Sequence, residues 1–176
     1  RFNVAPLNTL YDYSEYVKKY PIPMITHEIG QWCVYPNYDE IKKYTGVLKP
    51  YNYQIFRESL RDHHMLDLAE EFTRASGKFH LIQKKEEFES YYRTPGMAGY
   101  HLLQLNDFPG QGTSPVGVVD VFWDPKPYVT ADEFKSMVSP CLPLLLTSSF
   151  VWTNDSIFTG EARIANFGKS DIKKAV

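Results

Sequence analysis

A carboxylate at the end of an apolar run is the feature of this sequence that most directly suggests chemistry. Glu28 follows Met24-Ile25 through Thr26 and His27, and Gly30 then allows the chain to turn sharply. A carboxylate in this position costs free energy unless it is solvated, paired or functional. Glu28 is therefore a candidate catalytic residue. The alternative is a structural glutamate that is held by an ion pair or by hydrogen bonds.

A second polar group follows another apolar run, residues 98–105. Gln104, Asn106 and Asp107 lie there and are candidates for binding the hydroxyl groups of a substrate. Asn106 and Asp107 precede Phe-Pro-Gly, so turn formation is the alternative explanation for both. Trp32 suits either stacking on the apolar face of a sugar ring or closing the mouth of a barrel.

Other histidines and charged residues favour structural roles. Along a strand His27 should point away from its neighbour Glu28, which favours a buried or supporting role. The pair at positions 63–64 has no metal-ligand partner at a useful spacing and indicates a solvated helix face. The charged run at 84–87, Lys-Lys-Glu-Glu, is typical of an exposed helix face. We expect neither a metal ion nor a cofactor.

The composition excludes several classes of protein. The chain has 176 residues, 43% apolar and 23% charged, with a formal net charge of -2. This balance provides no basic surface for nucleic acid or for an anionic membrane, and no apolar run reaches the roughly 20 residues that cross a bilayer. The two cysteines leave the redox compartment undecided. Aromatic residues make up 15%, which is typical either of sugar-binding clefts or of a large core with amphipathic surface tyrosines.

Two segments are predicted to be the strands that carry these polar groups. Residues 24–29 are short and mostly apolar, like a strand buried on both faces of a parallel sheet. Residues 98–105 form a second strand of this kind, followed by a loop rich in turn residues. In α/β barrels the reactive groups lie at the C-terminal ends of the strands. We therefore expect both polar groups to lie at that edge.

The segments around these strands are predicted to be helical. The expected helices are 10–20, 37–46, a segment from Pro50 whose apolar period continues to Phe72, 86–92 and 131–137, with a break or cap at Gly77. Strand, helices, strand and helix in this order make a βαβ unit and its following helix.

The chain changes character after Pro140. Residues 144–152 and 158–167 are predicted to be strands separated by a turn at 154–156. We therefore expect an α/β domain at 1–140 and the start of a β-sandwich domain at 141–176. Two parallel strands cannot close a barrel. The chain is thus expected to be a fragment or to be completed by another segment, and its start at Arg1, without Met or a signal peptide, agrees with this.

Five motifs follow one another along the chain. They are His27-Glu-Ile-Gly-Gln-Trp-Cys-Val-Tyr-Pro36, Tyr44-Thr-Gly-Val-Leu-Lys49, Ala75-Ser-Gly-Lys78, Arg93-Thr-Pro-Gly96 and Leu105-Asn-Asp-Phe-Pro-Gly-Gln-Gly-Thr113. Together they resemble a group of family-2 glycoside hydrolases related to β-galactosidases, over roughly residues 1–140. The tail from Phe158 to Asn166 resembles the opening strands of the sandwich domain that follows the barrel in that family.

The resemblance implies an α/β fold: a partial (β/α)8 TIM barrel, made of its last two strands with their helices, followed by strands of an immunoglobulin-like sandwich. In that family the seventh strand ends in the catalytic nucleophile, a Glu followed shortly by Gly, and Glu28 falls at that position. Residues 98–105 would be the eighth strand, whose following loop would line the sugar pocket. This strand lacks the Trp-rich ending of true β-galactosidases, so a preference for galactosides is not implied.

The implied activity is the hydrolysis of O-glycosidic bonds in a carbohydrate substrate by double displacement, with retention of configuration. That mechanism needs two carboxyl groups about 5 Å apart, one attacking the anomeric carbon and one protonating the leaving oxygen. The family's acid/base Glu lies after Asn at the end of the fourth strand, upstream of Arg1. The isolated chain is therefore expected to be inactive and to need the upstream part of its barrel.

Two other functions remain open. One is a non-catalytic carbohydrate-binding or scaffold protein that kept the barrel and lost the chemistry. The other is an unrelated α/β domain in which Glu28 is structural. An Asn-Glu pair at a strand end in the upstream sequence would favour the enzyme over the binder. A periplasmic or secreted location follows from the family analogy alone.

Overall fold

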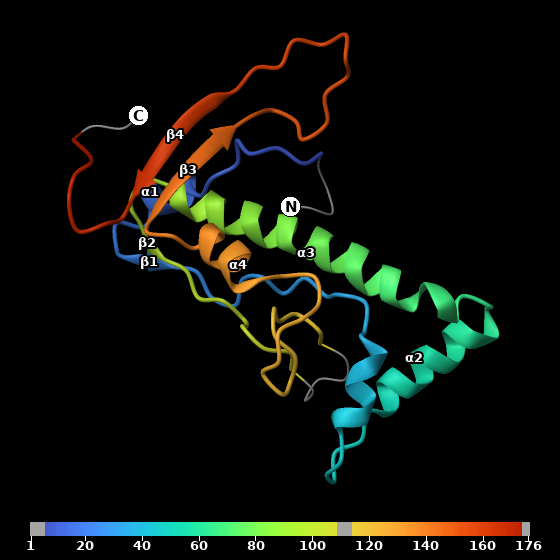
Figure 1. Cartoon of the computed structure of the whole chain (residues 1–176). Helices are drawn as coiled ribbons and strands as arrows, with labels where there is room; N and C mark the ends of the chain where they lie inside the picture. Colours follow the sequence, from blue (N-terminus) through green and yellow to red (C-terminus); the bar gives the residue numbers. More distant parts are fainter. Residues whose placement is uncertain (1–5, 109–113, 174–176) are drawn as a thin grey trace. The chain divides into compact units, whose positions relative to one another are not determined.

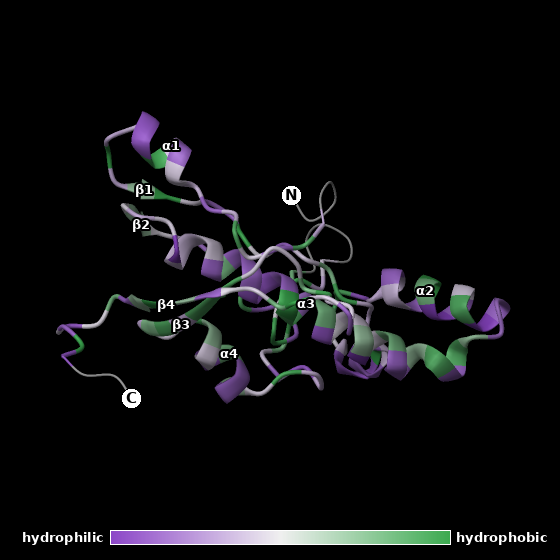
Figure 2. Ribbon diagram, turned by 90° about the horizontal axis from the view of Figure 1, so that it is seen from above, coloured by the Kyte–Doolittle hydropathy of each residue, from purple (hydrophilic) through white to green (hydrophobic). Residues whose placement is uncertain are grey.

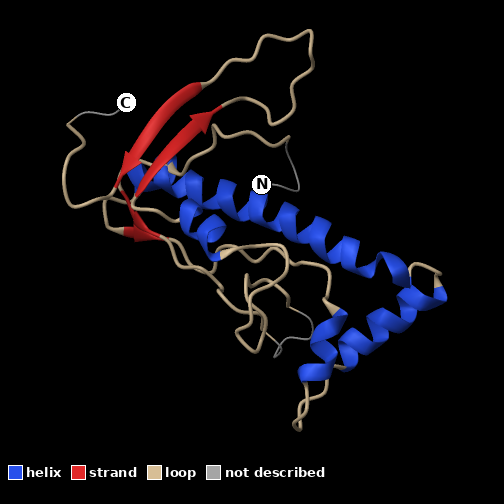
Figure 3. Cartoon of the chain, viewed as in Figure 1, coloured by secondary structure: helices blue, strands red, loops and turns tan. Residues whose placement is uncertain are grey.

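The computed structural model describes residues 6–108 and 114–173 (Figure 1). Within these ranges the chain is a mixture of helices and short strands (Figure 3). The helices are α1 (Ser14–Lys19), η1 (Tyr38–Lys43), α2 (Tyr51–Asp62), η2 (Leu66–Leu68), α3 (Ala69–Tyr92) and α4 (Ala131–Met137), and the strands are β1 (Met24–Ile25), β2 (Met97–Gly99), β3 (Cys141–Leu146) and β4 (Glu161–Asn166). The last five residues of the motif 105–113 lie outside the described residues.

The chain forms two compact units. Unit 1 comprises residues 1–26, 85–100 and 132–176, and unit 2 comprises residues 27–84 and 101–131. Helix α3 contributes to both, because its residues up to Lys84 belong to unit 2 and the rest to unit 1. Each unit is made of separate stretches of the chain, so the units do not test the domain boundary expected at residue 140. That boundary stays a prediction. No helix of the described residues is long and apolar enough to span a membrane.

Unit 1 contains the parallel strand pair that the sequence indicates. Strands β1 and β2 pair in parallel, with Met24 opposite Met97 and Ile25 opposite Gly99. The parallel pairing is confirmed, but both strands are shorter than the segments 24–29 and 98–105. Extended backbone cannot continue through Glu28 because its φ is positive, at 56°.

A β-hairpin forms the C-terminal part of unit 1. Strands β3 and β4 pair antiparallel from Cys141 opposite Asn166 to Leu146 opposite Glu161. The inward residues Leu142, Leu144 and Leu146 alternate with exposed ones, as in a strand with one buried face. The observed strands are shorter than the predicted ones. The sheet has two strands among the described residues, so both are edge strands, which is where a proline such as the one at position 143 is tolerated.

The C-terminal end of α3 provides the aromatic and charged core of unit 1. Phe88 is fully buried and stacks on Tyr100 with 5.1 Å between ring centroids. Arg93 and Glu86 form a buried ion pair, with 2.5 Å between Nη2 and Oε1. Arg93 also donates from Nε to the backbone carbonyl of Tyr11, at 2.6 Å. A buried pair of this kind is costly to break, so it holds the Arg93 side chain in place, and the hydrogen bond from Arg93 to Tyr11 joins the N-terminal segment to the end of α3.

Unit 2 is built on a helical hairpin. Helix α2 begins after Pro50, as predicted, and ends at Asp62, where the chain turns through His64 with φ of 58°. The short helix η2 follows and leads into α3 (Figure 1). One continuous period through Phe72 is therefore wrong. Hydrophobic and hydrophilic residues continue to alternate along α2 and α3 (Figure 2), so the apolar spacing does not reveal the turn.

Gly77 lies inside α3 and neither breaks nor caps it, which contradicts the prediction. A Cβ atom at this position would lie 2.2 Å from ring atoms of Tyr128. Tyr128 is 2% exposed, and its hydroxyl donates to the carbonyl of Gly117 at 3.1 Å. The glycine is therefore needed because the aromatic ring packs directly on the helix backbone.

The charged run at 84–87 is not a solvated helix face. Lys84 is 0% exposed and Glu86 is 2% exposed, whereas Lys85 is exposed and pairs with Glu89 one turn later. Buried charges are stable where distant segments supply hydrogen bonds or counter-charges. Lys84 bonds the carbonyl of Gly30, which lies 54 positions away, and Glu86 pairs with Arg93, which directly follows α3. The first of these partners could not be predicted from spacing along the helix.

Candidate functional site

Glu28 lies where the chain leaves its extended conformation. The next residue, Ile29, forms a parallel bridge with Leu102. Its N–H donates to the carbonyl of His101 and its carbonyl accepts from Leu103, both at 3.0 Å. The backbone on one side of Glu28 is thus fixed by hydrogen bonds.

Glu28 itself adopts the left-handed conformation, with φ of 56°. This conformation costs roughly 1–2 kcal/mol for a residue with a Cβ atom. The side chain of Glu28 is 47% exposed, so its carboxylate is accessible. Strained non-glycine residues gather at functional sites, where the surrounding structure holds them in place.

The carboxylate of Glu28 has two polar neighbours. The side-chain amide of Gln31 donates to the Oε2 atom at 3.2 Å and to the backbone carbonyl of Glu28 at 3.0 Å. The Nε2 atom of His27 lies 3.9 Å from Oε1. The expectation of a buried His27 pointing away is wrong, since its side chain is 74% exposed. Strand alternation does not apply where the following residue has a positive φ.

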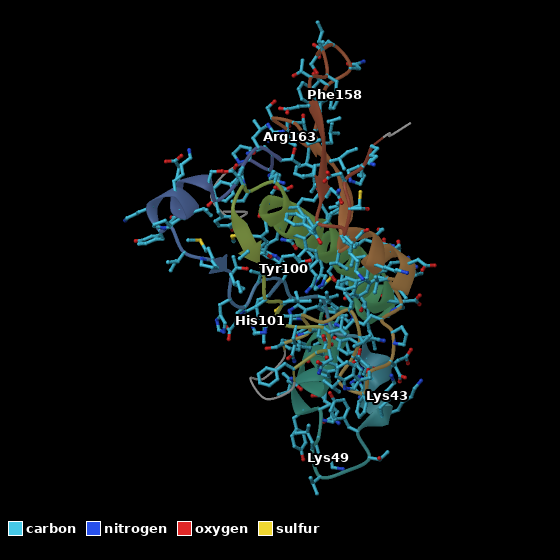
Figure 4. All side chains as sticks on the ribbon, turned by 90° about the vertical axis from the view of Figure 1, so that its left-hand side faces the viewer. Lys43, Lys49, Tyr100, His101, Phe158 and Arg163 are labelled. Atoms are coloured by element: carbon cyan, nitrogen blue, oxygen red, sulfur yellow. The ribbon has the colours of Figure 1, made fainter. Side chains whose placement is uncertain are left out.

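The ring of His27 also faces His101, with 5.6 Å between ring centroids. His101 is labelled in Figure 4 and is exposed. The exposed side chains of His27, Glu28 and His101 therefore lie in the two segments, 24–29 and 98–105, that were predicted to be strands. His101 was not among the predicted site residues.

The predicted substrate-binding residues have different surroundings. Trp32 is half-buried and its backbone carbonyl accepts from His80. Gln104 is half-buried and follows a cis peptide bond. The amide of Asn106 donates to the carbonyl of Asp107 at 2.9 Å. Nothing in these contacts assigns a ligand, so their substrate-binding role stays a prediction.

Asp107 is 2% exposed and belongs to a buried network of charges. Its Oδ1 atom accepts from Nζ of Lys126 at 2.6 Å and from the backbone N–H of Gly117 at 2.8 Å. Its Oδ2 atom is buried without a hydrogen-bond partner. Burial raises the pKa of Asp107, and the positive charge of Lys126 acts against this rise. These contacts favour a structural role for one of the two carboxylate oxygens.

Glu40 is the second carboxylate of this network and is also 2% exposed. Its Oε2 atom has no hydrogen-bond partner. Burial, followed by the charge of Asp107, raises the pKa of Glu40 to about 7. Asn37 and Glu40 have the spacing of a capping box, but the Asn37 side chain accepts from the N–H of Asp39 instead. No sequence pattern indicated the burial of Glu40.

Lys43 of η1, labelled in Figure 4, continues the charged network toward the surface. Its Nζ atom bonds Oδ2 of Asp120 at 2.5 Å and Oδ2 of Asp124 at 2.6 Å. Beside the network, Tyr44, Tyr53, Phe108 and Asp107 line a cavity of about 30 Å³. That volume holds one or two water molecules and no sugar ring.

A larger cavity of about 370 Å³ lies in unit 1. Its lining includes Met97, Tyr100, Pro140 and Phe167, and none of its lining residues is charged. It therefore offers apolar contacts but no acid or base. Among the described residues, no group of three or more His, Cys, Asp and Glu side chains could hold a metal ion.

Helix α3 reaches the Glu28 segment through two buried polar side chains. Nζ of Lys84 donates to the carbonyl of Gly30 at 3.0 Å, and Nδ1 of His80 lies 2.5 Å from the carbonyl of Trp32. Burial, followed by the charge of Lys84, lowers the pKa of His80 to about 3. The imidazole is thus neutral near pH 7, and Nδ1 must carry its proton to donate to that carbonyl.

Comparison with models of known protein families found no match to this chain, and comparison with curated protein sequences found none either.

Proposed function

We propose that this chain supplies the nucleophile, Glu28, of a retaining glycoside hydrolase. The single observation that supports this best is the carboxylate of Glu28. It is exposed, it is hydrogen-bonded by Gln31, and it follows an extended segment in a left-handed backbone conformation. A positive φ alone also occurs at the turn through His64, but a nucleophile must be both accessible and oriented, and the Glu28 carboxylate has both properties.

In this proposal Glu28 attacks the anomeric carbon while a carboxylic acid protonates the departing glycosidic oxygen. A covalent glycosyl–enzyme ester forms, and the alcohol leaves. Water then attacks the same carbon, the former acid accepts its proton, and the carboxylate of Glu28 is released. Gln31 keeps the carboxylate turned in one direction throughout. The acid comes from an upstream part of the barrel and not from residues 1–176.

The substrate in this proposal is a carbohydrate, and no metal ion or cofactor takes part. Trp32 offers an aromatic face for a sugar ring, and the side-chain amides of Gln104 and Asn106 offer hydrogen bonds to hydroxyl groups. Asp107, the remaining predicted substrate-binding residue, is 2% exposed and is not given this role. The partial (β/α)8 barrel and the start of a sandwich domain belong to the same proposal. The rest of the barrel is the partner that completes the site.

The test is to treat the complete protein with a panel of 2-fluoro glycosides, which trap the glycosyl–enzyme ester. Peptide mapping is expected to find the label on Glu28. The Glu28→Gln variant provides the control and should take up no label. A label on another residue would refute the assignment, and a protein that binds sugars without being labelled or turning over would favour the carbohydrate-binding alternative.

A further inference from the structure

The carbonyl groups that follow Glu28 are held by one face of α3. Lys84 bonds the carbonyl of Gly30, and His80 bonds that of Trp32. Both side chains are fully buried, at 0% exposed. Placing an ammonium group in the interior is expensive, and here its hydrogen bond is directed at the segment that carries the proposed nucleophile.

The spacing of the two contacts matches the geometry of the helix. Residues four apart on a helix lie roughly 6 Å apart along its axis and on the same face. His80 and Lys84 therefore meet the carbonyls of residues 32 and 30 as a pair, with the chain running antiparallel to the helix.

Gly30 allows the backbone to pass close to Leu102 and Lys84. It has φ of 81°, and a Cβ atom there would lie 2.6 Å from Cδ1 of Leu102 and 3.0 Å from Nζ of Lys84. Ile29 is held by the backbone of residues 101 and 103. The strand bridge on one side and Lys84 on the other hold the backbone that follows Glu28, whose own φ is 56°.

We propose that His80 and Lys84 are positioning residues that hold the 28–32 segment so that the Glu28 carboxylate faces its substrate. This inference rests on the proposed function of Glu28 and adds the means by which its strained conformation is maintained. Neither residue touches the reacting atoms. Their removal should leave the carboxylate present but poorly aligned, and misplacement by about 1 Å costs roughly 100-fold in rate.

The variants are chosen to separate hydrogen bonding from volume. Lys84→Met keeps the buried stem and removes the ammonium group. His80→Leu removes the ring donor, whereas His80→Asn places an amide donor near the position of Nδ1 and should restore the bond to Trp32. Lys85→Met removes a charge from the next position of the same helix, where the side chain is 56% exposed, and is the matched control.

The experiment measures the rate of labelling by a 2-fluoro glycoside in the complete protein, together with the number of sites labelled per molecule. A merely structural role would lower the number of competent sites and leave the rate constant per site unchanged. We expect Lys84→Met and His80→Leu to lower that rate constant at least 10-fold. His80→Asn and Lys85→Met should stay within about threefold of wild type, and KM for a turned-over substrate should change little in all four.

Two results would overturn the inference in distinguishable ways. If wild type is labelled on Glu28 but Lys84→Met and His80→Leu label at the wild-type rate per site, the positioning role fails and the proposed function stands. If the label maps to a residue other than Glu28, the proposed function fails and the positioning role fails with it.

Discussion

At the scale of single residues, the backbone conformation of Glu28 supports a functional role more strongly than the presence of its carboxylate does. An exposed carboxylate after a strand is common, but a strained one with hydrogen bonds fixing the residues around it is not. The sequence indicated the first property and could not indicate the second, because the hydrogen bonds that hold the backbone after position 28 come from residues 80, 84, 101 and 103, far from it in the sequence. The same limit applies to Glu40, whose burial depends on segments far from it in the sequence.

The strain at Glu28 can be measured directly. Glycine adopts a positive φ at no steric cost, and alanine does not. We expect the Glu28→Gly protein to be more stable than the Glu28→Ala protein by about 1 kcal/mol, the reverse of the usual preference. Urea unfolding of both variants measures the difference. Equal stability, or a more stable alanine variant, would show that the backbone at position 28 is unstrained.

Glu40 should make the stability of the protein depend on pH. Its pKa rises from 4.5 when unfolded to about 7 when folded, so the folded state binds the proton more tightly than the unfolded state. Stability is therefore lost as the pH rises from about 4.5 through 7, where the buried carboxylate must ionise beside Asp107. Lys126 and Lys43 reduce this loss, and Asp120 adds to it.

Replacing Glu40 by glutamine removes this group's contribution. Glu40→Gln should be more stable than wild type at pH 8, by up to about 3 kcal/mol, and similar to wild type near pH 4.5. The matched control is Asp39→Asn, which alters a side chain that is 82% exposed and should change little at either pH. Urea unfolding at the two pH values decides the matter, and a stability difference that does not vary with pH would contradict it.

At the scale of elements, the sequence predicted a helix boundary well where residues next to that boundary determine it. The capping pattern before Ala131 predicted the bounds of α4, and the prolines after residue 20 end the segment that contains α1. The break between α2 and α3 was missed because neither Gly nor Pro marks it. The break placed at Gly77 was wrong because that glycine serves the packing of Tyr128, which lies 51 positions away in the sequence.

The contact between Gly77 and Tyr128 predicts that alanine at position 77 lowers the stability of the protein, whereas helix propensity alone predicts that it raises it. Alanine is favoured over glycine by about 1 kcal/mol inside a helix, yet a methyl group at position 77 would overlap the ring of Tyr128. We expect Gly77→Ala to destabilise the protein by about 2 kcal/mol or more, as overpacking does. Gly46→Ala, at a position with no neighbouring atom within 4 Å, should be close to neutral. Thermal unfolding of the two variants compares them, and a stabilised Gly77→Ala would refute the contact.

At the scale of the whole molecule, several large apolar side chains of the described residues are strongly exposed. Ile22, Val151 and Ile157 are 68%, 81% and 84% exposed, and both sheets have two strands within the described ranges. Large exposed apolar surface is typical of faces that pack on other parts of a protein. The mixed helix–strand content was predictable from the sequence, whereas the barrel and the sandwich rest on the resemblance and stay proposals.

The isolated chain should therefore behave as part of a larger fold. We expect it to associate or to unfold without a sharp transition, and to show no glycosidase turnover, because the proposed mechanism takes its second carboxyl group from an upstream part of the barrel. Sedimentation and thermal unfolding of residues 1–176 test the first point, and assays with activated glycosides test the second. A compact, cooperatively unfolding monomer or a measurable turnover would contradict the account.

The central claim is that Glu28 is the nucleophile, and chemical rescue of Glu28→Gly tests it most directly. In the complete protein this variant should lose at least about 1,000-fold in turnover of an activated glycoside. Added azide should then restore the reaction by occupying the space of the lost carboxylate. We predict a glycosyl azide of anomeric configuration opposite to that of the substrate. A variant that keeps its activity, or a rescued product with the substrate's own configuration, would contradict the claim.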